Sequence, residues 1–133
     1  EAAKAAFLAL NVSRIGLVTP YTPEVTRSVE DNFAKSGIAV SAVGSFYEKN
    51  DLKVGKITEK SILEAAISVG QDPRCESVFI SCTSLRSAKI IAKAEAHLGK
   101  PVISSNYALA WHLLRLAGIN DKVPEAGKLF TQH

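Results

Sequence analysis

Short apolar segments alternate with helical patterns along the chain, and this alternation restricts the possible folds more than any other feature of the sequence. The apolar segments are residues 14–19, 38–43, 77–81 and 102–103. The helical patterns are residues 1–10, 23–36, 57–70, 85–98 and 108–116. Continuous apolar runs are typical of buried parallel strands, and the helices between them form crossovers on the faces of the sheet. We therefore predict a three-layer α/β fold in which helices flank a four-stranded parallel sheet.

Two regions show no regular pattern. Residues 44–56 are polar and irregular, and a loop of this length in a compact domain is often functional. Residues 120–133 contain Pro124 and Gly127 and have no clear periodicity, so no element is predicted there.

The composition is that of an ordinary globular protein with one core. The chain has 133 residues, of which 47% are hydrophobic and 22% are charged, and this fits a single domain. The net charge of +3 is spread along the chain, so no nucleic-acid partner is expected. Neither an apolar stretch of about 20 residues nor a signal peptide is present, and we expect no membrane partner and a cytoplasmic location.

Cys75 and Cys82 are the only cysteines in the chain. They flank an extended segment, which holds their side chains too far apart for a disulfide bond. We predict two free thiols in a reducing compartment. The sequence has no set of four Cys or His residues at zinc spacing and no glycine-rich phosphate motif, so no metal or nucleotide cofactor is predicted.

Cys82 is the leading candidate for chemistry. Ligands of parallel sheets bind beyond the carboxyl ends of the strands, and Cys82 directly follows the third predicted strand. The helix predicted from residue 85 would place Cys82 at a helix N-terminus, where a thiolate is stabilised. The N–H groups of Thr83 and Ser84 could bind a carboxylate there. Position alone gives equal weight to the alternative that Cys82 is a small core residue.

Other polar side chains follow strand ends or lie in the long loop. Tyr21, after Thr19 and Pro20, could donate a hydrogen bond to a substrate carboxylate, or it could fill a gap beside the next helix. Asn50 could serve the same purpose from the loop, although asparagine in a polar loop is usually a turn residue. Cys75 precedes its strand and so lies at the wrong end of a parallel sheet, which favours a structural role.

Four segments, in this order and spacing, resemble the second half of maleate isomerase-like proteins, a branch of the aspartate/glutamate racemase superfamily that includes relatives of arylmalonate decarboxylase. They are VTPYTPEV (18–25), NDLKVGK (50–56), SCTSLRS (81–87) and GKPVISSNYALAWHLLRLAGI (99–119). The resemblance extends from about residue 14 to residue 130. It implies two similar α/β domains that face each other across a cleft, each with a cysteine at a strand end and without a cofactor.

The resemblance also implies roles for individual residues. Cys82 matches the second-domain cysteine, which in the isomerase branch is the proton donor to the substrate carbon. Tyr21 and Asn50 match residues that hold the substrate carboxylates, and Thr83 matches the carboxylate-binding turn. The predicted substrate-binding residues are Pro20, Tyr21, Asn50, Thr83 and Ser84.

We therefore expect residues 1–133 to be one α/β domain, the C-terminal half of a two-domain enzyme. The expected activity is cofactor-independent, cysteine-based cis–trans isomerisation of a small dicarboxylate, of the maleate-to-fumarate type. The expected partners are that substrate and either the missing N-terminal domain or a second copy in a homo-oligomer. The isolated half is expected to be inactive. Racemisation of an amino acid or hydantoin, decarboxylation of a malonate, and non-catalytic binding of a small molecule remain open alternatives.

Overall fold

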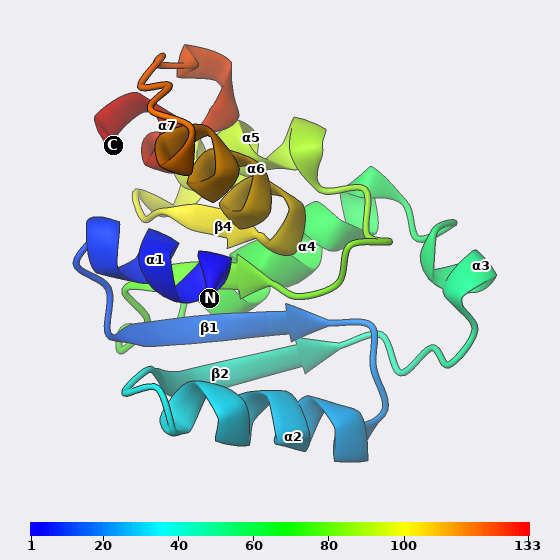
Figure 1. The fold of residues 1–133 in the computed structure, drawn as a ribbon. Coiled ribbons are helices and arrows are strands. Elements are labelled where there is room, and N and C mark those ends of the chain that lie inside the picture. The colour runs from blue at the N-terminus through cyan, green and yellow to red at the C-terminus, as the bar shows by residue number, and fades with distance from the viewer.

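The computed structural model describes residues 1–133 and confirms the predicted four-stranded parallel sheet (Figure 1). The strand order is β2-β1-β3-β4, and each neighbouring pair is parallel. The strands are β1 (Arg14–Thr19), β2 (Ala39–Ser45), β3 (Ser77–Ile80) and β4 (Val102–Ser104). Because β1 and β3 are central and parallel, the segments that follow them emerge next to each other at one edge of the sheet.

Helices cover both faces of this sheet. The α-helices are α1 (Ala2–Ala9), α2 (Pro23–Ala34), α3 (Asp51–Val54), α4 (Glu59–Gly70), α5 (Ile91–Leu98), α6 (Ser105–Leu116) and α7 (Lys128–Gln132). Two 3-10 helices are η1 (Ala88–Ile90) and η2 (Pro124–Ala126). None of the helices combines the length and the apolar character that crossing a membrane requires.

Two hydrophobic cores, one on each face, make up the interior. On one face, Ile62 of α4 and Ile91 of α5 pack with Val18 and Ile80 of the central strands. On the other face, α1, α2, α6 and α7 pack against the sheet. Three edge-to-face phenylalanine rings hold this second core together, with centroids 5.3 to 5.7 Å apart: Phe7, Phe33 and Phe79. The three-layer prediction is thus confirmed.

The structure differs from the prediction in four segments and also in the helix predicted after Cys82. The strand predicted for 38–43 continues to Ser45, and the irregular segment 44–56 contains the short helix α3. The helix predicted from residue 108 begins at Ser105, where the Ser104 side chain accepts a hydrogen bond from the N–H of Tyr107. The tail forms η2 and α7, because Phe130 and neighbouring apolar side chains are buried in the core.

The largest difference concerns the helix predicted for residues 85–98. Residues 83–87 form a loop, η1 follows, and α5 begins only at Ile91. The side chain of Leu85 is 1% exposed and packs in the core beside α4 and α5. Since the loop must turn inward to bury Leu85, the chain cannot enter a regular helix directly after Cys82.

A buried carboxylate joins three elements far from this loop. Glu95 of α5 is 7% exposed. It accepts a hydrogen bond from the N–H of Val102 in β4 at 2.9 Å and one from the N–H of Lys128 in α7 at 2.8 Å. Burial raises the pKa of the Glu95 carboxyl above its usual value. The carboxyl group therefore connects α5, the edge strand and the C-terminal helix.

Candidate active site

The predicted site residues at the ends of β1 and β3 come together at the carboxyl edge of the sheet. Pro20 and Tyr21 follow β1, and Ser81, Cys82 and Thr83 follow β3. The N–H of Ser81 donates to the carbonyl oxygen of Val18 at 2.8 Å, so the two strands are still paired where they end. This edge is where parallel sheets bind ligands.

Cys82 has an unusual backbone conformation. Its φ angle is +122°, a region that residues with a side chain rarely adopt. The side chain is 9% exposed, and the N–H donates to the Oγ of Ser105 at 3.2 Å. Non-glycine residues in such conformations cluster at functional sites, where the surrounding structure holds them in place. The geometry therefore favours the functional interpretation of Cys82 over that of an ordinary core residue.

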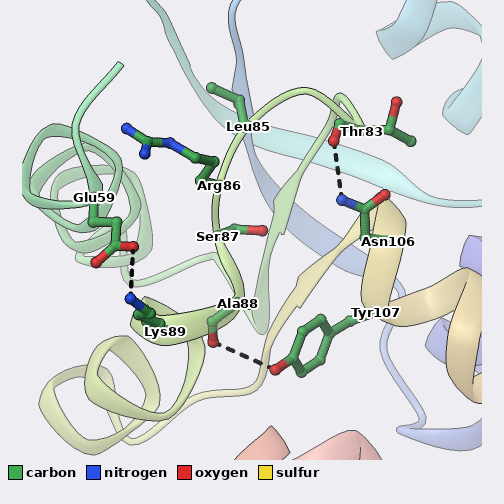
Figure 2. A pocket seen from close by; sticks show the side chains of 9 residues that line it. All are labelled: Glu59, Thr83, Leu85, Arg86, Ser87, Ala88, Lys89, Asn106 and Tyr107. Carbon is green, nitrogen blue, oxygen red and sulfur yellow. Dashed lines mark hydrogen bonds and ion pairs between the residues drawn. The ribbon is translucent and has the colours of Figure 1, made fainter. Parts of the chain in front are cut away.

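The helix that supports the Cys82 turn is α6, and not the helix predicted at residue 85. Ser105, the first residue of α6, accepts the Cys82 N–H, and the side chain of Asn106 donates to the carbonyl oxygen of Thr83 at 3.0 Å (Figure 2). The predicted placement of Cys82 at the N-terminus of its own helix is wrong, because α5 begins nine residues later.

Strain at Cys82 leads to a prediction about stability. Cys82→Gly and Cys82→Ala both remove the thiol, but only glycine adopts a positive φ without a steric penalty. We expect the glycine variant to be more stable than the alanine variant by about 1 kcal/mol, after the larger chain entropy of unfolded glycine is subtracted. Urea denaturation of the two variants measures the difference. A more stable alanine variant would show that the backbone of residue 82 is relaxed.

Tyr21 reaches the Cys82 turn from the end of β1. Burial raises the pKa of the Tyr21 phenol to about 12, and a hydrogen bond to Cys82 adds to this effect, while Ser81 opposes it. The backbone is fixed as well, because the Oγ of Ser45 donates to the carbonyl oxygen of Tyr21 at 2.6 Å. The buried Pro20 accepts a hydrogen bond from the N–H of Glu48 at 2.7 Å. The Tyr21 phenol is therefore protonated at neutral pH, can donate a hydrogen bond, and is attached to a backbone segment fixed by hydrogen bonds.

The pKa of Tyr21 can be measured directly. Burial raises the pKa of Tyr107 as well, so the measurement uses a Tyr107→Phe background. In this background we expect ultraviolet absorbance to show one tyrosine that ionises at about pH 12, well above the usual value, because burial disfavours the charged phenolate. This transition should disappear in Tyr21→Phe. Because the pKa of Tyr21 is higher in the folded state than in the unfolded state, the free energy of unfolding should fall as the pH rises from about 10 to 12. A Tyr21→Phe variant that retains the late transition would contradict this placement.

The turn after Cys82 offers unpaired backbone donors. The N–H groups of Thr83 and Ser84 donate to no protein acceptor. Thr83 is exposed and Ser84 is half-buried, so a ligand can reach this turn. Successive free N–H groups can form a binding site for an anion such as a carboxylate.

Asn50 caps a short helix, a structural role that the sequence did not indicate. Its Oδ1 accepts hydrogen bonds from the N–H groups of Leu52 and Lys53 at 3.0 and 3.2 Å and so caps α3. The side chains on either side of it, Lys49 and Asp51, line a pocket of about 220 Å³ together with Tyr21. Asn50 itself does not line that pocket.

Other residues at this edge were not predicted as site residues. Ser105 and Asn106 position the Cys82 turn, and Ser45 positions Tyr21. The available signal was that residues 104–106 follow the fourth predicted strand at the same edge. Their actual partners are 23 residues away in the chain, and no local pattern predicts such contacts.

Cys75 lies at the opposite end of β3, as predicted. It is 2% exposed, and its Sγ donates to the carbonyl oxygen of Ser77 at 2.9 Å. Burial raises the pKa of its thiol. Both cysteines are free thiols in the structure. No three His, Cys, Asp or Glu side chains lie close enough together to hold a metal ion.

Comparisons with known proteins match almost the whole chain. Maleate isomerase from Nocardia farcinica is 29% identical over 124 residues, which cover 93% of this chain and 49% of that protein. Arylmalonate decarboxylase from Bordetella bronchiseptica is 26% identical over 126 residues, which cover 93% of this chain and 52% of that protein. The chain therefore spans about half the length of these relatives.

Solved structures and a family model agree with these relatives. A cysteine-to-serine mutant of Nocardia farcinica maleate cis-trans isomerase, with a covalently bound succinylcysteine intermediate, superposes with a TM-score of 0.94 at 26% identity. The superposition covers 99% of this chain and 54% of that chain. The model of the family described as arylmalonate decarboxylase matches residues 1–130. The resemblance drawn from the four sequence segments is confirmed, and the chain belongs to the arylmalonate decarboxylase family.

Proposed function

We propose that this chain supplies one cysteine, Cys82, to a cofactor-independent enzyme that isomerises a small cis-dicarboxylate such as maleate. The observation that carries the proposal is the grouping of Cys82, the Tyr21 phenol and the free N–H groups of Thr83 and Ser84 at one sheet edge. Such a reaction needs a thiol near the substrate carbon and hydrogen-bond donors that hold the carboxylates. The maleate isomerases among the relatives support it.

The proposed reaction uses two cysteines. A thiolate from the other half of the enzyme adds to one alkene carbon of the cis-diacid, and the electrons of the double bond move toward the adjacent carboxylate. The Cys82 S–H then donates its proton to the second carbon. Rotation about the new single bond follows. Cys82 takes the proton back, and the carbon–sulfur bond breaks to release the trans-diacid and the original thiolate.

The neighbours of Cys82 have supporting roles in this proposal. The N–H groups of Thr83 and Ser84 hold the carboxylate on which negative charge develops. Tyr21, held beside Pro20 at the end of β1, remains protonated and donates a hydrogen bond to the second carboxylate. The amide nitrogen of Asn50, whose neighbours Lys49 and Asp51 line a pocket with Tyr21, is proposed as a further donor to the substrate.

The proposal requires a second cysteine that this chain does not place at the site. Cys75 cannot serve, because it is buried at the other end of β3. We therefore propose that residues 1–133 are the C-terminal half of a two-domain enzyme, and that an N-terminal domain or a second copy completes the cleft. The isolated chain should bind a dicarboxylate weakly and should not turn it over.

Alkylation of Cys82 tests whether the part of the active site that this chain supplies binds a dicarboxylate. In a Cys75→Ser background, maleate should slow the reaction of Cys82 with iodoacetamide, because the carboxylates occupy the Tyr21 and Thr83 donors. Tyr21→Phe should weaken this protection. Adding the N-terminal domain should then produce fumarate from maleate. If maleate gives neither protection nor fumarate in the completed enzyme, the alternative of a non-catalytic binding domain gains support.

Decarboxylation of a malonate is the second candidate, and the family model together with the Bordetella bronchiseptica relative favours it. Here the bond between the central carbon and one carboxylate breaks, and carbon dioxide leaves. The electron pair passes to the remaining carboxylate, and Cys82 protonates the carbon. Release of carbon dioxide from phenylmalonate, without formation of fumarate from maleate, would favour this reaction over isomerisation.

A further inference from the structure

A pocket of about 400 Å³ lies beside the loop that follows Cys82, and we call it the Ser87 pocket. Residues of the loop 83–87 and of η1 line it, with Asn106 and Tyr107 of α6 on one side of this segment and Glu59 of α4 on the other (Figure 2). Neither Cys82 nor Tyr21 lines it. Thr83 is the single residue that it shares with the proposed substrate-binding residues.

Ser87 is the unusual side chain in this pocket. The residue is 3% exposed, and its hydroxyl makes no hydrogen bond with another protein group. Figure 2 shows the hydroxyl directed into the space between the loop and α6. The only fully buried side-chain nitrogen or oxygen without a partner is Nε1 of Trp111, so the Ser87 oxygen is open to the pocket and its hydroxyl is free to donate to a ligand there.

Two further donors face the same pocket. The amide of Asn106 uses one N–H for the carbonyl oxygen of Thr83 and has a second N–H without a partner. The phenol of Tyr107 makes only a long bond of 3.4 Å to the carbonyl oxygen of Ala88, which a better acceptor could replace. Burial also raises the pKa of Tyr107, so its phenol stays protonated at neutral pH. The polar wall therefore consists mainly of donors.

The charges at the rim favour an anion. Lys89 pairs with Glu59 at 3.7 Å, whereas Arg86 has no acidic partner. The rim thus carries one unbalanced positive charge, which attracts a negatively charged ligand and is screened by salt.

We propose that the Ser87 pocket is a second ligand site, separate from the Cys82 site, and that it binds the carboxylate of a small organic acid. The carboxylate accepts hydrogen bonds from the Ser87 hydroxyl, the Asn106 amide and the Tyr107 phenol. The guanidinium group of Arg86 at the rim contributes attraction at longer range. A carboxylate matches a cluster of donors because it is an acceptor with two oxygens.

Succinate is the probe for this site, followed by NMR of the ¹⁵N-labelled chain. Saturable shifts in the millimolar range should be concentrated in residues 85–89 and 106–107. Ser87→Ala should weaken binding about tenfold, because the ligand loses a charge-assisted hydrogen bond. Ser68→Ala, an exposed serine on α4, is the matched control and should leave the affinity unchanged. Equal affinities for these two variants would overturn the proposal.

Two further variants test the donors and the charge of the Ser87 pocket. Tyr107→Phe is nearly isosteric and should also weaken binding, which covers the case in which Ser87→Ala fails to fold. Arg86→Gln should weaken binding more at low salt than at high salt. Lys93→Gln removes an exposed charge outside the pocket, and it should leave the affinity unchanged at both salt concentrations.

A last comparison distinguishes the Ser87 pocket from the Cys82 site. Tyr21→Phe removes a carboxylate donor of the Cys82 site and lies outside the Ser87 pocket, so it should retain the succinate shifts, even if the proposed isomerisation fails. Loss of the shifts in Tyr21→Phe would assign succinate to the Cys82 site instead. Tighter binding of inorganic phosphate than of succinate would contradict the carboxylate assignment.

Discussion

Replacement of Cys82 with serine should lower kcat/KM for maleate about a thousandfold in the enzyme completed by its N-terminal domain. The physical reason is that a serine hydroxyl is a far weaker acid than a thiol, so it cannot deliver and recover the proton on the substrate carbon. The variant should still fold, since Cys82 contributes a small side chain that is 9% exposed. Formation of fumarate, followed by its absorbance, measures the loss.

Cys75→Ser is the matched control for this experiment. It makes the same chemical change in a cysteine at the opposite end of β3, and the serine hydroxyl can donate to the carbonyl oxygen of Ser77 in place of the thiol. Its kcat/KM should stay within a few-fold of the wild-type value. A Cys82→Ser enzyme that loses less than about tenfold would remove Cys82 from the reaction and leave it as a core residue.

The largest expected effect on stability comes from Glu95→Ala. The change leaves the N–H groups of Val102 and Lys128 without acceptors, and each unpaired buried donor costs about 1–3 kcal/mol. It also opens space beside Gly127, whose backbone packs closely against the Glu95 carboxylate. We expect the free energy of unfolding to fall by about 3 kcal/mol or more. Glu64→Ala, on the exposed face of α4, should change it by less than about 0.5 kcal/mol.

The pKa shift of Glu95 adds a pH dependence with a definite sign. Burial raises its pKa in the folded state, so folding favours the protonated carboxyl. This contribution to stability is complete below the unfolded pKa of about 4.3 and is lost as the pH rises through the folded pKa. Relative to Glu95→Gln, the wild type should therefore lose stability in urea denaturation as the pH rises from about 4 toward neutrality. If the wild type instead gained stability relative to Glu95→Gln as the pH rose over this range, the raised pKa of Glu95 would be contradicted.

Much of the architecture is encoded locally in the sequence. The apolar runs that became β1, β3 and β4 are buried on both faces, and this burial is the reason why they lack alternation. Thr58 caps α4 through its side chain, and Gly99 ends α5 with a positive φ, as short-range signals predict. The rule that ligands bind at the carboxyl ends of parallel strands then placed Pro20, Tyr21 and Cys82 at one edge.

The local structure around Cys82 could not be predicted in the same way. A helix pattern from residue 85 is present in the sequence, but burial of Leu85 makes residues 83–87 a loop. The support of the turn comes instead from Ser105 and Asn106, through contacts between residues 23 positions apart. Asn50 illustrates the same limit, because its oxygen caps a helix that the polar sequence of the loop did not indicate.

Local patterns in the chain thus specify the succession of strands and helices, the parallel sheet, the family and the edge at which the site lies. Periodicity and capping act between residues that are neighbours in the chain, so they are visible before the fold is known. Packing of the layers, in contrast, sets the positive φ of Cys82, the support of its turn by α6 and the unpaired hydroxyl of Ser87. These features depend on which distant side chains compete for the same buried space and the same donors, and that competition is settled only when the layers pack.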